Sequence, residues 1–484
     1  MGKSREMGII AVLAQAMAWA LAVWGAWEAG VGLAQLLGYG HSNHALYAMT
    51  GSFLNPGPFS GFVAMAMPVA LWLYLKATNC IARYVAALLF VLMFCVLPAG
   101  WSRSAWIAAA VACLWVYGCH KRWGVWLKWC YTHRRKRLAK WVAATGAALL
   151  LLAVGLFLLK PDSARGRLFM WRMEWRAIAE KPWRGHGDGA FAAAYGRAQE
   201  AYFAQGDYAA WEERVAGTPE YAFNEYLQGA IEYGVPTVLI AICLTLFAAW
   251  RGYRLKRYGI VGGLLALAIF AFSSYPFRHW EFVAVYLMLL WACIVPRGWK
   301  GVWLSLLPVV AGVLCFRAAR IAERERQEGY EEARFYYERG AYEAAIEDYM
   351  YAYQFYREDG KFLFELGHAL HKKERYEESN RYLMEAEEHS CDPMILNIIG
   401  KNYQALGQYK EAEHYYRRSI NRLPGRIYPY YLLALLYSEP DYYHPQQLEE
   451  ACRMVLEKEP KVHSTAIEEM RDNVKNILNN GINY

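Results

Sequence analysis

The pattern of apolar and polar residues divides the chain into two parts near residue 317. Before it, long apolar runs alternate with short polar segments; after it, Glu, Lys, Arg and Tyr prevail. A membrane-spanning helix needs roughly 20 mostly apolar residues, and no run beyond residue 317 is that long. The criterion of roughly 20 residues predicts about nine spans, at 9–27, 59–75, 84–99, 104–119, 141–159, 234–250, 259–274, 281–295 and 301–317. We therefore predict an all-α fold with a polytopic helical membrane domain over residues 1–317.

The polar C-terminal part repeats itself with a period of about 34 residues. The copies are marked by Leu366-Gly367 and Ile399-Gly400, and by Tyr342, Tyr376 and Tyr409. Such a period, with Gly, Tyr and small residues at fixed places, is typical of tetratricopeptide repeats, in which helix pairs stack to bury their apolar faces. We predict an α-solenoid over 321–460, followed by a tail over 461–484. Its concave surface suits a protein or peptide partner, although the same stack also suits a rigid spacer.

The placement of Lys and Arg between the spans predicts how the chain crosses the membrane. The segment 119–141 is strongly basic, and cytoplasmic loops carry an excess of these residues. Counting spans outward from it keeps the N-terminus and the basic loops at 76–83, 251–257 and 297–300 inside. The large loop 160–226 and the repeat domain then lie outside. An even number of spans would place the repeats inside instead.

Composition changes this picture little. Of the 484 residues, 56% are hydrophobic, and the formal net charge is +8. This charge does not indicate nucleic acid binding, because the basic residues form short clusters between apolar runs, where topology explains them. None of the ten cysteines has the Cys-x-x-Cys spacing of a redox or zinc site, and we expect no metal and no cofactor.

Four groups of residues at the external edge carry candidate chemistry, since ionisable residues at a membrane boundary are costly and commonly functional. They are Ser102 to Trp106, Arg167 to Ile178, Glu180 to Phe191 and Glu220 to Gly234. Each also has a purely structural interpretation. These interpretations are an interfacial anchor for Arg103, a solvated face for the basic residues of 167–178, an ordinary loop residue for His186, and helix capping for Asn224 and Glu225.

Two of these groups predict a definite local structure. Trp171, Trp175 and Ile178 recur at helical spacing, so we expect a helix whose apolar face lies along the membrane surface. The alternate glycines of segment 185–189 indicate positive φ angles or a close approach of another backbone. This segment is not a phosphate-binding P-loop, because the Lys-Ser/Thr pair is missing.

The order of these motifs resembles that of one family. Ser-Arg at the mouth of a span precedes Arg-x-x-x-Trp, Pro-x-x-Gly-x-Gly-x-x-x-Phe and Asn-Glu-Tyr-Leu-Gln, and Gly51 to Pro56 is similar to a further external motif. Over roughly residues 50–295, the chain resembles the O-antigen ligase and polymerase superfamily of bacterial envelope glycosyltransferases. The resemblance implies a multi-pass protein of the bacterial inner membrane that contacts membrane lipids. Its own repeat domain would lie in the periplasm. It also implies metal-independent transfer of a glycan from a polyprenyl-pyrophosphate donor to lipid A–core, another glycan or a protein.

The resemblance suggests where the donor would bind. Arg103, Arg167 and Arg278 are expected to hold its pyrophosphate, because guanidinium groups bind phosphate oxygens bidentately and stabilise a leaving group that becomes negative. All three are predicted to lie outside, at the depth where a lipid-borne pyrophosphate would be found.

The acceptor side departs from the family pattern. Asn224 is expected to position the acceptor, and ligases of the family usually have His immediately before this Asn. Here that residue is Phe223, which leaves Glu225 and His186 as candidate bases. The alternative function is therefore a non-catalytic membrane scaffold whose repeats recruit a partner in envelope polysaccharide assembly.

Overall fold

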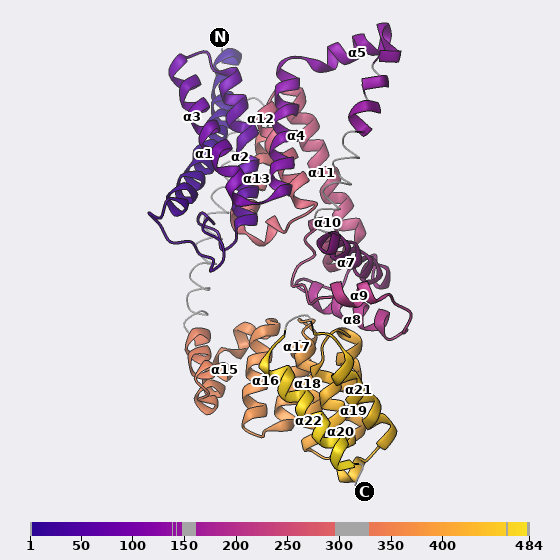
Figure 1. The fold of residues 1–484 in the computed structure, drawn as a ribbon. Helices are drawn as coiled ribbons and strands as arrows, with labels where there is room; N and C mark the ends of the chain where they lie inside the picture. Colours follow the sequence, from indigo (N-terminus) through magenta and orange to yellow (C-terminus); the bar gives the residue numbers. More distant parts are fainter. Residues whose placement is uncertain are drawn as a thin grey trace. The chain divides into compact units, whose positions relative to one another are not determined.

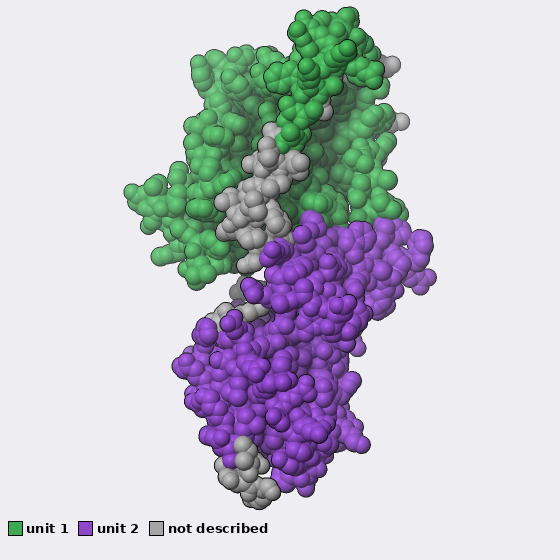
Figure 2. Space-filling model, turned by 45° about the vertical axis from the view of Figure 1, so that its right-hand side comes forward, with its two compact units in different colours: residues 1–156, 223–226, 237–315 green, residues 157–222, 227–236, 316–484 purple. Residues whose placement is uncertain are grey.

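The structure is a computed structural model that describes residues 2–137, 139–141, 143–147, 161–295, 329–460 and 463–481. Every regular element among these residues is a helix, as predicted (Figure 1). Contacts divide the chain into two compact units, coloured green and purple in Figure 2 and described separately below. Unit 1 comprises residues 1–156, 223–226 and 237–315, and unit 2 comprises residues 157–222, 227–236 and 316–484.

Unit 1 is a helix bundle arranged around one central helix. Its elements are α1 (Gly2–Leu36), α2 (Pro56–Lys76), α3 (Cys80–Val96), η1 (Leu97–Gly100), α4 (Arg103–His120), α5 (Trp123–His133), α11 (Val235–Arg254, from Thr237 onward), α12 (Tyr258–Ala271), η2 (Pro276–Arg278) and α13 (Trp280–Ile294). Helix α2 packs against α1, α3, α4 and α12 and is almost entirely buried. Helices α3 and α11 instead expose most of their apolar side chains, as expected for helices that face lipid.

Small residues allow the helices of unit 1 to approach closely. A Cβ atom on Gly61 of α2 would lie 2.7 Å from Cδ1 of Phe270 on α12, and one on Gly259 of α12 would lie 2.6 Å from Cβ of Trp72. Within lipid there is little hydrophobic drive to bring helices together, so this close packing is a main source of their association.

Three of the predicted membrane spans are supported by length and composition. The helices Pro56–Lys76, Cys80–Gly100 and Val235–Arg254 are long and apolar enough to cross a membrane, and the shorter apolar helices Tyr258–Ala271 and Trp280–Ile294 coincide with two further predictions. Helices also form at 9–27 and 104–119, within α1 and α4, although neither is among those three. The predicted span 301–317, and 141–159 apart from its first residues, lie outside the described part of the chain.

Unit 2 combines the long loop predicted to be external with the C-terminal helices. Its elements are α7 (Pro161–Glu180), α8 (Phe191–Phe203), α9 (Ala210–Val215), α10 (Glu225–Tyr233, from Leu227 onward), α15 (Tyr342–Tyr356), α16 (Gly360–Lys372), α17 (Tyr376–Glu387), α18 (Pro393–Ala405), α19 (Tyr409–Arg422), α20 (Tyr428–Tyr437), η3 (Pro440–Tyr442), α21 (Pro445–Glu457) and α22 (Thr465–Gly481). The residues predicted as a tail thus include α22, which packs against α20 and α21. Contacts group the loop residues with the C-terminal helices, and the predicted domain boundaries stay a prediction.

Successive helix pairs make up the C-terminal part of unit 2. Helices α16 and α17, α18 and α19, and α20 and α21 pack as neighbours. Glycine brings the two helices of a pair together: a Cβ atom on Gly367 would lie 2.6 Å from Cγ of Leu383, and one on Gly400 would lie 2.6 Å from Cδ1 of Tyr416. The two Leu/Ile-Gly dipeptides recognised in the sequence therefore occupy equivalent places.

We expect Gly400→Arg to destabilise the helix pair α18–α19 by about 3 kcal/mol or more, because a charged side chain would enter a fully packed contact with Tyr416. Hydrogen exchange of the full-length protein in detergent should accelerate in both helices. His414→Arg is the matched control, since it adds the same side chain at an exposed position inside α19 and should leave exchange unchanged. Equal exchange in the two variants would show that Gly400 is not a packing position.

Candidate functional site

The segment predicted as the Gly51–Pro56 motif is held in place by polar side chains of α1. The side-chain oxygen of Gln35 accepts hydrogen bonds from the backbone N–H groups of Thr50 (2.9 Å) and Gly51 (2.8 Å). The carboxylate of Glu28 accepts from the backbone N–H (3.0 Å) and the hydroxyl (2.8 Å) of Ser52. Both α1 side chains are buried, and Gly51 has a φ of 60°, which favours glycine. The conformation of this loop is therefore built into the bundle.

Arg103 lies at the same end of unit 1. The turn before it is fixed by the indole N–H of Trp106, which donates to the carbonyl of Leu97 (3.0 Å), and by Gly100, where an added Cβ would lie 3.3 Å from Cβ of Ser60. Arg103 is the first residue of α4, and it is exposed. A cation in the first turn of a helix is unfavourable with respect to the helix dipole, so Arg103 does not stabilise α4.

The turn that carries Arg278 is connected to the beginning of α10. Arg278 is the exposed last residue of η2, and the backbone N–H of Phe277 beside it donates to Oε1 of Glu225 (2.7 Å). The phenol hydroxyl of Tyr226 donates to the carbonyl of Ala268 on α12 (2.9 Å). This hydrogen bond anchors the beginning of α10 on α12. Glu225 therefore positions the Arg278 turn, a role that neither the base nor the capping interpretation anticipated.

Asn224 and Phe223 complete this connection. The side-chain oxygen of Asn224 accepts from the backbone N–H of Tyr226 (3.1 Å), as expected for a residue that caps α10. Phe223 adopts a left-handed φ of 50°, and its ring packs against Tyr275 with centroids 5.4 Å apart. The structure thus supports the capping interpretation of Asn224, while its role toward an acceptor stays a prediction.

His279 is a candidate that the sequence analysis missed. It follows Arg278 directly, and its ring lies between those of Phe53 (centroids 5.6 Å apart) and Tyr275 (6.0 Å). Its Nε2 atom is buried and has no hydrogen-bond partner among the described residues. Burial lowers the pKa of His279, so the imidazole is neutral near pH 7 and retains a basic nitrogen. Its place beside Arg278 was the signal that could have identified it.

In unit 2, the glycine-rich segment pairs with the end of α10. The backbone N–H of His186 donates to the carbonyl of Ile231 (2.7 Å), that of Gly187 to Glu232 (3.0 Å), and that of Val235 to Pro182 (2.9 Å). Positive φ angles occur at all three alternate glycines, Gly185, Gly187 and Gly189, as predicted. A Cβ atom on Gly185 would lie 2.7 Å from the carbonyl oxygen of Ile231, so the predicted close approach of another backbone occurs there.

His186 is fixed by this arrangement. Its Nε2 atom lies 2.9 Å from the carbonyl oxygen of Ala177 on α7, and its Nδ1 atom is buried with no partner among the described residues. The contact links the glycine-rich segment to the helix that carries Arg167. His186 therefore holds local structure, and its role as a base stays a prediction.

Helix α7 forms as predicted, and a second stripe of its residues is buried within unit 2. Phe169, Met173 and Ala177 are buried against the rest of unit 2, whereas Trp175 is 61% exposed and only Ile178 of the predicted apolar face shares the burial. The cause is that α8 packs on α7 and covers a stripe of smaller residues. The placement of α7 on a membrane surface stays a prediction.

The arginines of α7 differ in their surroundings. Arg172 forms an ion pair with Glu212, and Arg176 stacks over the ring of Tyr202 at 4.7 Å. These contacts attach α7 to α8 and α9, so the expectation of a merely solvated basic face is incomplete. Arg167, near the beginning of the helix, is exposed.

Glu174 is a buried acid on α7 that sequence reasoning did not identify. Both of its carboxyl oxygens are buried with no hydrogen-bond partner among the described residues. Burial raises its pKa from 4.5 to about 8, and the charge of Arg167 opposes this shift only in part. The carboxyl is therefore mostly protonated near neutral pH.

The raised pKa of Glu174 predicts a pH-dependent effect on stability. A folded pKa above the unfolded value means that Glu174 costs stability increasingly as the pH rises from 4.5 to about 8. We expect Glu174→Gln to leave thermal stability unchanged near pH 4 and to raise it toward pH 8, by up to roughly 1.4 kcal/mol per pH unit. Melting curves in detergent would measure this, with the exposed residue of the same helix, Glu180→Gln, as control. A benefit independent of pH would contradict the assignment.

The predicted site residues fall into two groups. Arg103, Asn224, Glu225 and Arg278 belong to unit 1, as does His279, whose ring contacts Phe53 beside the Gly51 loop. Arg167 and His186 belong to unit 2. Among the described residues, no group of three or more His, Cys, Asp or Glu side chains is arranged to hold a metal ion.

Fold and site together define an all-α membrane protein with polar and aromatic groups gathered in the loops at one end of a helix bundle. Residues 88–242 match the sequence model of a family described as O-antigen ligase. The matched region contains Arg103, Arg167, His186 and Glu225, whereas Arg278 lies beyond it. No curated protein matches the chain.

Proposed function

We propose that the protein is an envelope glycan ligase of the bacterial inner membrane, which transfers a glycan from a polyprenyl-pyrophosphate donor to an acceptor hydroxyl. The observation that carries this proposal is the match of residues 88–242 to the O-antigen ligase family, because it includes all four external motifs in order. The acceptor is lipid A–core, another glycan chain or a protein.

The reaction needs charge stabilisation and a base. The acceptor oxygen attacks the anomeric carbon, the bond from that carbon to the pyrophosphate breaks, and the pyrophosphate leaves with the electron pair. Arg103, Arg167 and Arg278 stabilise the leaving group through bidentate contacts to its oxygens. The acceptor proton passes to Glu225, or to His279, whose buried Nε2 has no partner in the part of the chain that the structure describes and is favoured for this reason as a second candidate.

The direct test is release of polyprenyl pyrophosphate from a lipid-linked glycan by the purified protein with acceptors of the three classes. Deletion of the gene should in parallel cause the lipid-linked glycan to accumulate. Turnover that depends on an acceptor would support the ligase. Absence of turnover with every acceptor would contradict it.

The alternative is a scaffold that recruits partners through C-terminal repeats of tetratricopeptide type. The helix pairs α16–α17, α18–α19 and α20–α21 support such repeats, and Phe223 in place of His favours a protein without ligase chemistry. Deletion of this part would then abolish partner binding, and substitutions of the external arginines would have no effect.

The topology of the proposal is a separate prediction. With residues 119–141 inside and 160–226 and 321–484 outside, an impermeant thiol reagent applied from outside should label Glu347→Cys but not Lys128→Cys in a Cys-free protein. Both positions are exposed on helices of their units, so access to the reagent differs only by side. The reverse labelling pattern would contradict the predicted orientation of the chain in the membrane.

A further inference from the structure

Four charged side chains connect two parts of unit 2. One part is residues 161–222, which we call the loop region, and the other is the set of C-terminal helices α15 to α22. The carboxylate of Glu200, on α8, accepts hydrogen bonds from Nε of Arg418 (2.7 Å) and Nε of Arg422 (3.1 Å), both on α19. Glu387, on α17, accepts from Nη2 of Arg422 (2.9 Å) and also pairs with Arg418. We name this group the charge cluster.

The charge cluster is largely buried and electrically balanced. The side chain of Arg422 is 1% exposed, and those of Glu200, Glu387 and Arg418 are between 16% and 24% exposed. Burial alone would raise the pKa of Glu387, but the two guanidinium groups hold it below its usual value. Two positive and two negative charges cancel, so loss of any one would leave an unbalanced charge in a largely buried contact.

Further contacts extend the same surface on both sides of the cluster. The amide of Gln199 donates to the carbonyl of Arg422, and an added Cβ on Gly196 would lie 2.7 Å from Cβ of Cys391. Glu213, on α9, pairs with Lys458 beyond α21 (2.7 Å). The loop region thus contacts α19, the residue Cys391 before α18 and the residue Lys458 after α21.

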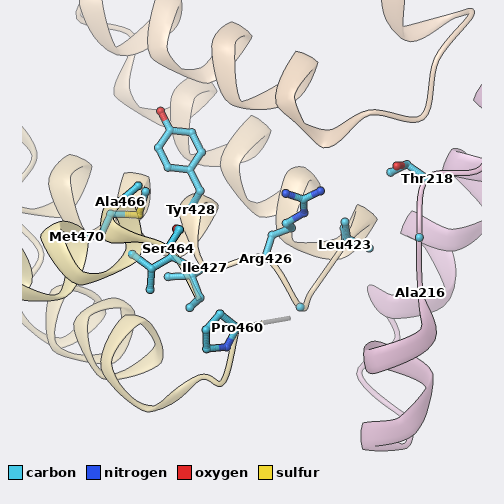
Figure 3. Close-up of a pocket in the computed structure, with 13 residues that line it drawn as sticks. Ala216, Thr218, Leu423, Arg426, Ile427, Tyr428, Pro460, Ser464, Ala466 and Met470 are labelled. Atoms are coloured by element: carbon cyan, nitrogen blue, oxygen red, sulfur yellow. The ribbon is translucent and has the colours of Figure 1, made fainter. Parts of the chain in front are cut away.

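A cavity of about 500 Å³ adjoins this contact surface (Figure 3). Ala216 and Thr218 of the loop region line one side of it, and Leu423, Arg426 and Pro460 of the C-terminal part line the other. The contact between the two parts is therefore not completely filled at this edge.

We propose that the C-terminal helix pairs are a structural part of the ligase, and that the charge cluster positions the segment 161–236, with Arg167 and His186, for glycan transfer. Glu200, Glu387, Arg418 and Arg422 are thus positioning residues. The role in glycan transfer rests on the proposed function, whereas the contact between the loop region and the C-terminal helices does not.

The contact between the loop region and the C-terminal helices also constrains how the chain crosses the membrane. Residues in buried contact must lie on the same side of the membrane, so the C-terminal domain lies on the side of the loop 160–226. This requires an even number of crossings between residues 234 and 329. The four spans predicted from the sequence in this stretch satisfy the requirement.

A cross-linking experiment on the full-length protein in membranes tests docking without any turnover. Glu213→Cys and Lys458→Cys, placed together in a Cys-free protein, should be bridged by a short bismaleimide. Adding Glu200→Lys should reduce bridging on the order of a hundredfold, since it sets a third positive charge against Arg418 and Arg422. Asp207→Lys is the matched control: it makes the same charge change at an exposed position after α8 and should leave bridging intact. Glu200→Arg combined with Arg418→Glu restores the net charge and the attraction between these two positions, but it sets like charges against Arg422 and Glu387, so it should recover only part of the bridging.

The rate of glycan transfer is then measured in the same variants with native Glu213 and Lys458. We expect about a hundredfold loss in Glu200→Lys, none in Asp207→Lys and partial recovery in the charge-exchanged pair, because a small misplacement of binding groups has large kinetic effects. Bridging that survives Glu200→Lys would overturn the charge cluster as the docking element. Lost bridging with undiminished transfer would overturn the positioning role. Absence of transfer in the unmodified protein would count against the proposed function and leave the docking result standing.

Discussion

Replacement of Arg103, Arg167 or Arg278 by Lys is expected to lower glycan transfer about a hundredfold in each case, a cost on the order of 3 kcal/mol in the transition state. Lysine keeps the charge but offers a single point of contact, whereas the planar guanidinium group binds two phosphate oxygens at once. None of the three side chains is buried, so the protein should still insert and fold. The measurement is polyprenyl-pyrophosphate release at saturating acceptor.

Arg176→Lys provides the matched control for this series. It lies on α7 with Arg167, is exposed, and stacks on Tyr202, a contact that lysine can also make. Its transfer rate should stay close to that of the unmodified protein. Undiminished transfer in all three test variants would remove the pyrophosphate site. Loss confined to Arg103 and Arg278 would restrict the site to unit 1.

The sequence predicted best what short-range patterns determine. Apolar runs of helical length located the helices of unit 1, and the recurrence of Leu366-Gly367 as Ile399-Gly400 located equivalent helix contacts. The alternate glycines 185, 187 and 189 predicted their positive φ angles, because few other residues adopt them readily. In each case the physical cause lies within a few residues of the pattern.

The rest could not be predicted because it depends on distant partners. The contact of Glu200 with Arg422 joins residues 222 positions apart, and neither side chain belongs to a recognisable motif. The buried face of α7 depends on where α8 packs. Phe169, Met173 and Ala177 are buried, whereas Trp175 is exposed. Burial of Glu174 follows from the same packing.

The candidate base illustrates this limit. The motif order drew attention to Glu225, but the structure shows that its Oε1 atom accepts from Phe277 and so holds the turn of Arg278. His279 was passed over because it stands in no motif. It becomes a candidate only when its buried Nε2, unpaired among the described residues, is seen beside Phe53 and Tyr275.

Two substitutions separate these candidates. Glu225→Gln keeps an oxygen that can accept from Phe277 but cannot take up a proton, so a positioning role would survive and a catalytic one would not. His279→Gln removes the imidazole. Whichever residue is the base, its substitution should lower transfer by roughly 10²–10⁴-fold, and the other should have a small effect.

The pH dependence of the transfer rate gives the second, independent readout. Because burial lowers the pKa of His279, a base at this position is active at neutral pH, and transfer should fall only as the pH drops below 6.5, when the imidazole gains a proton. That acidic limb should disappear from the residual activity of His279→Gln but persist in Glu225→Gln. An acidic limb unchanged in His279→Gln, together with a near-normal rate, would exclude His279. A large loss in Glu225→Gln alone would then identify the carboxylate as the base, whereas near-normal rates in both variants would leave His186, whose Nδ1 is likewise buried, as the remaining candidate.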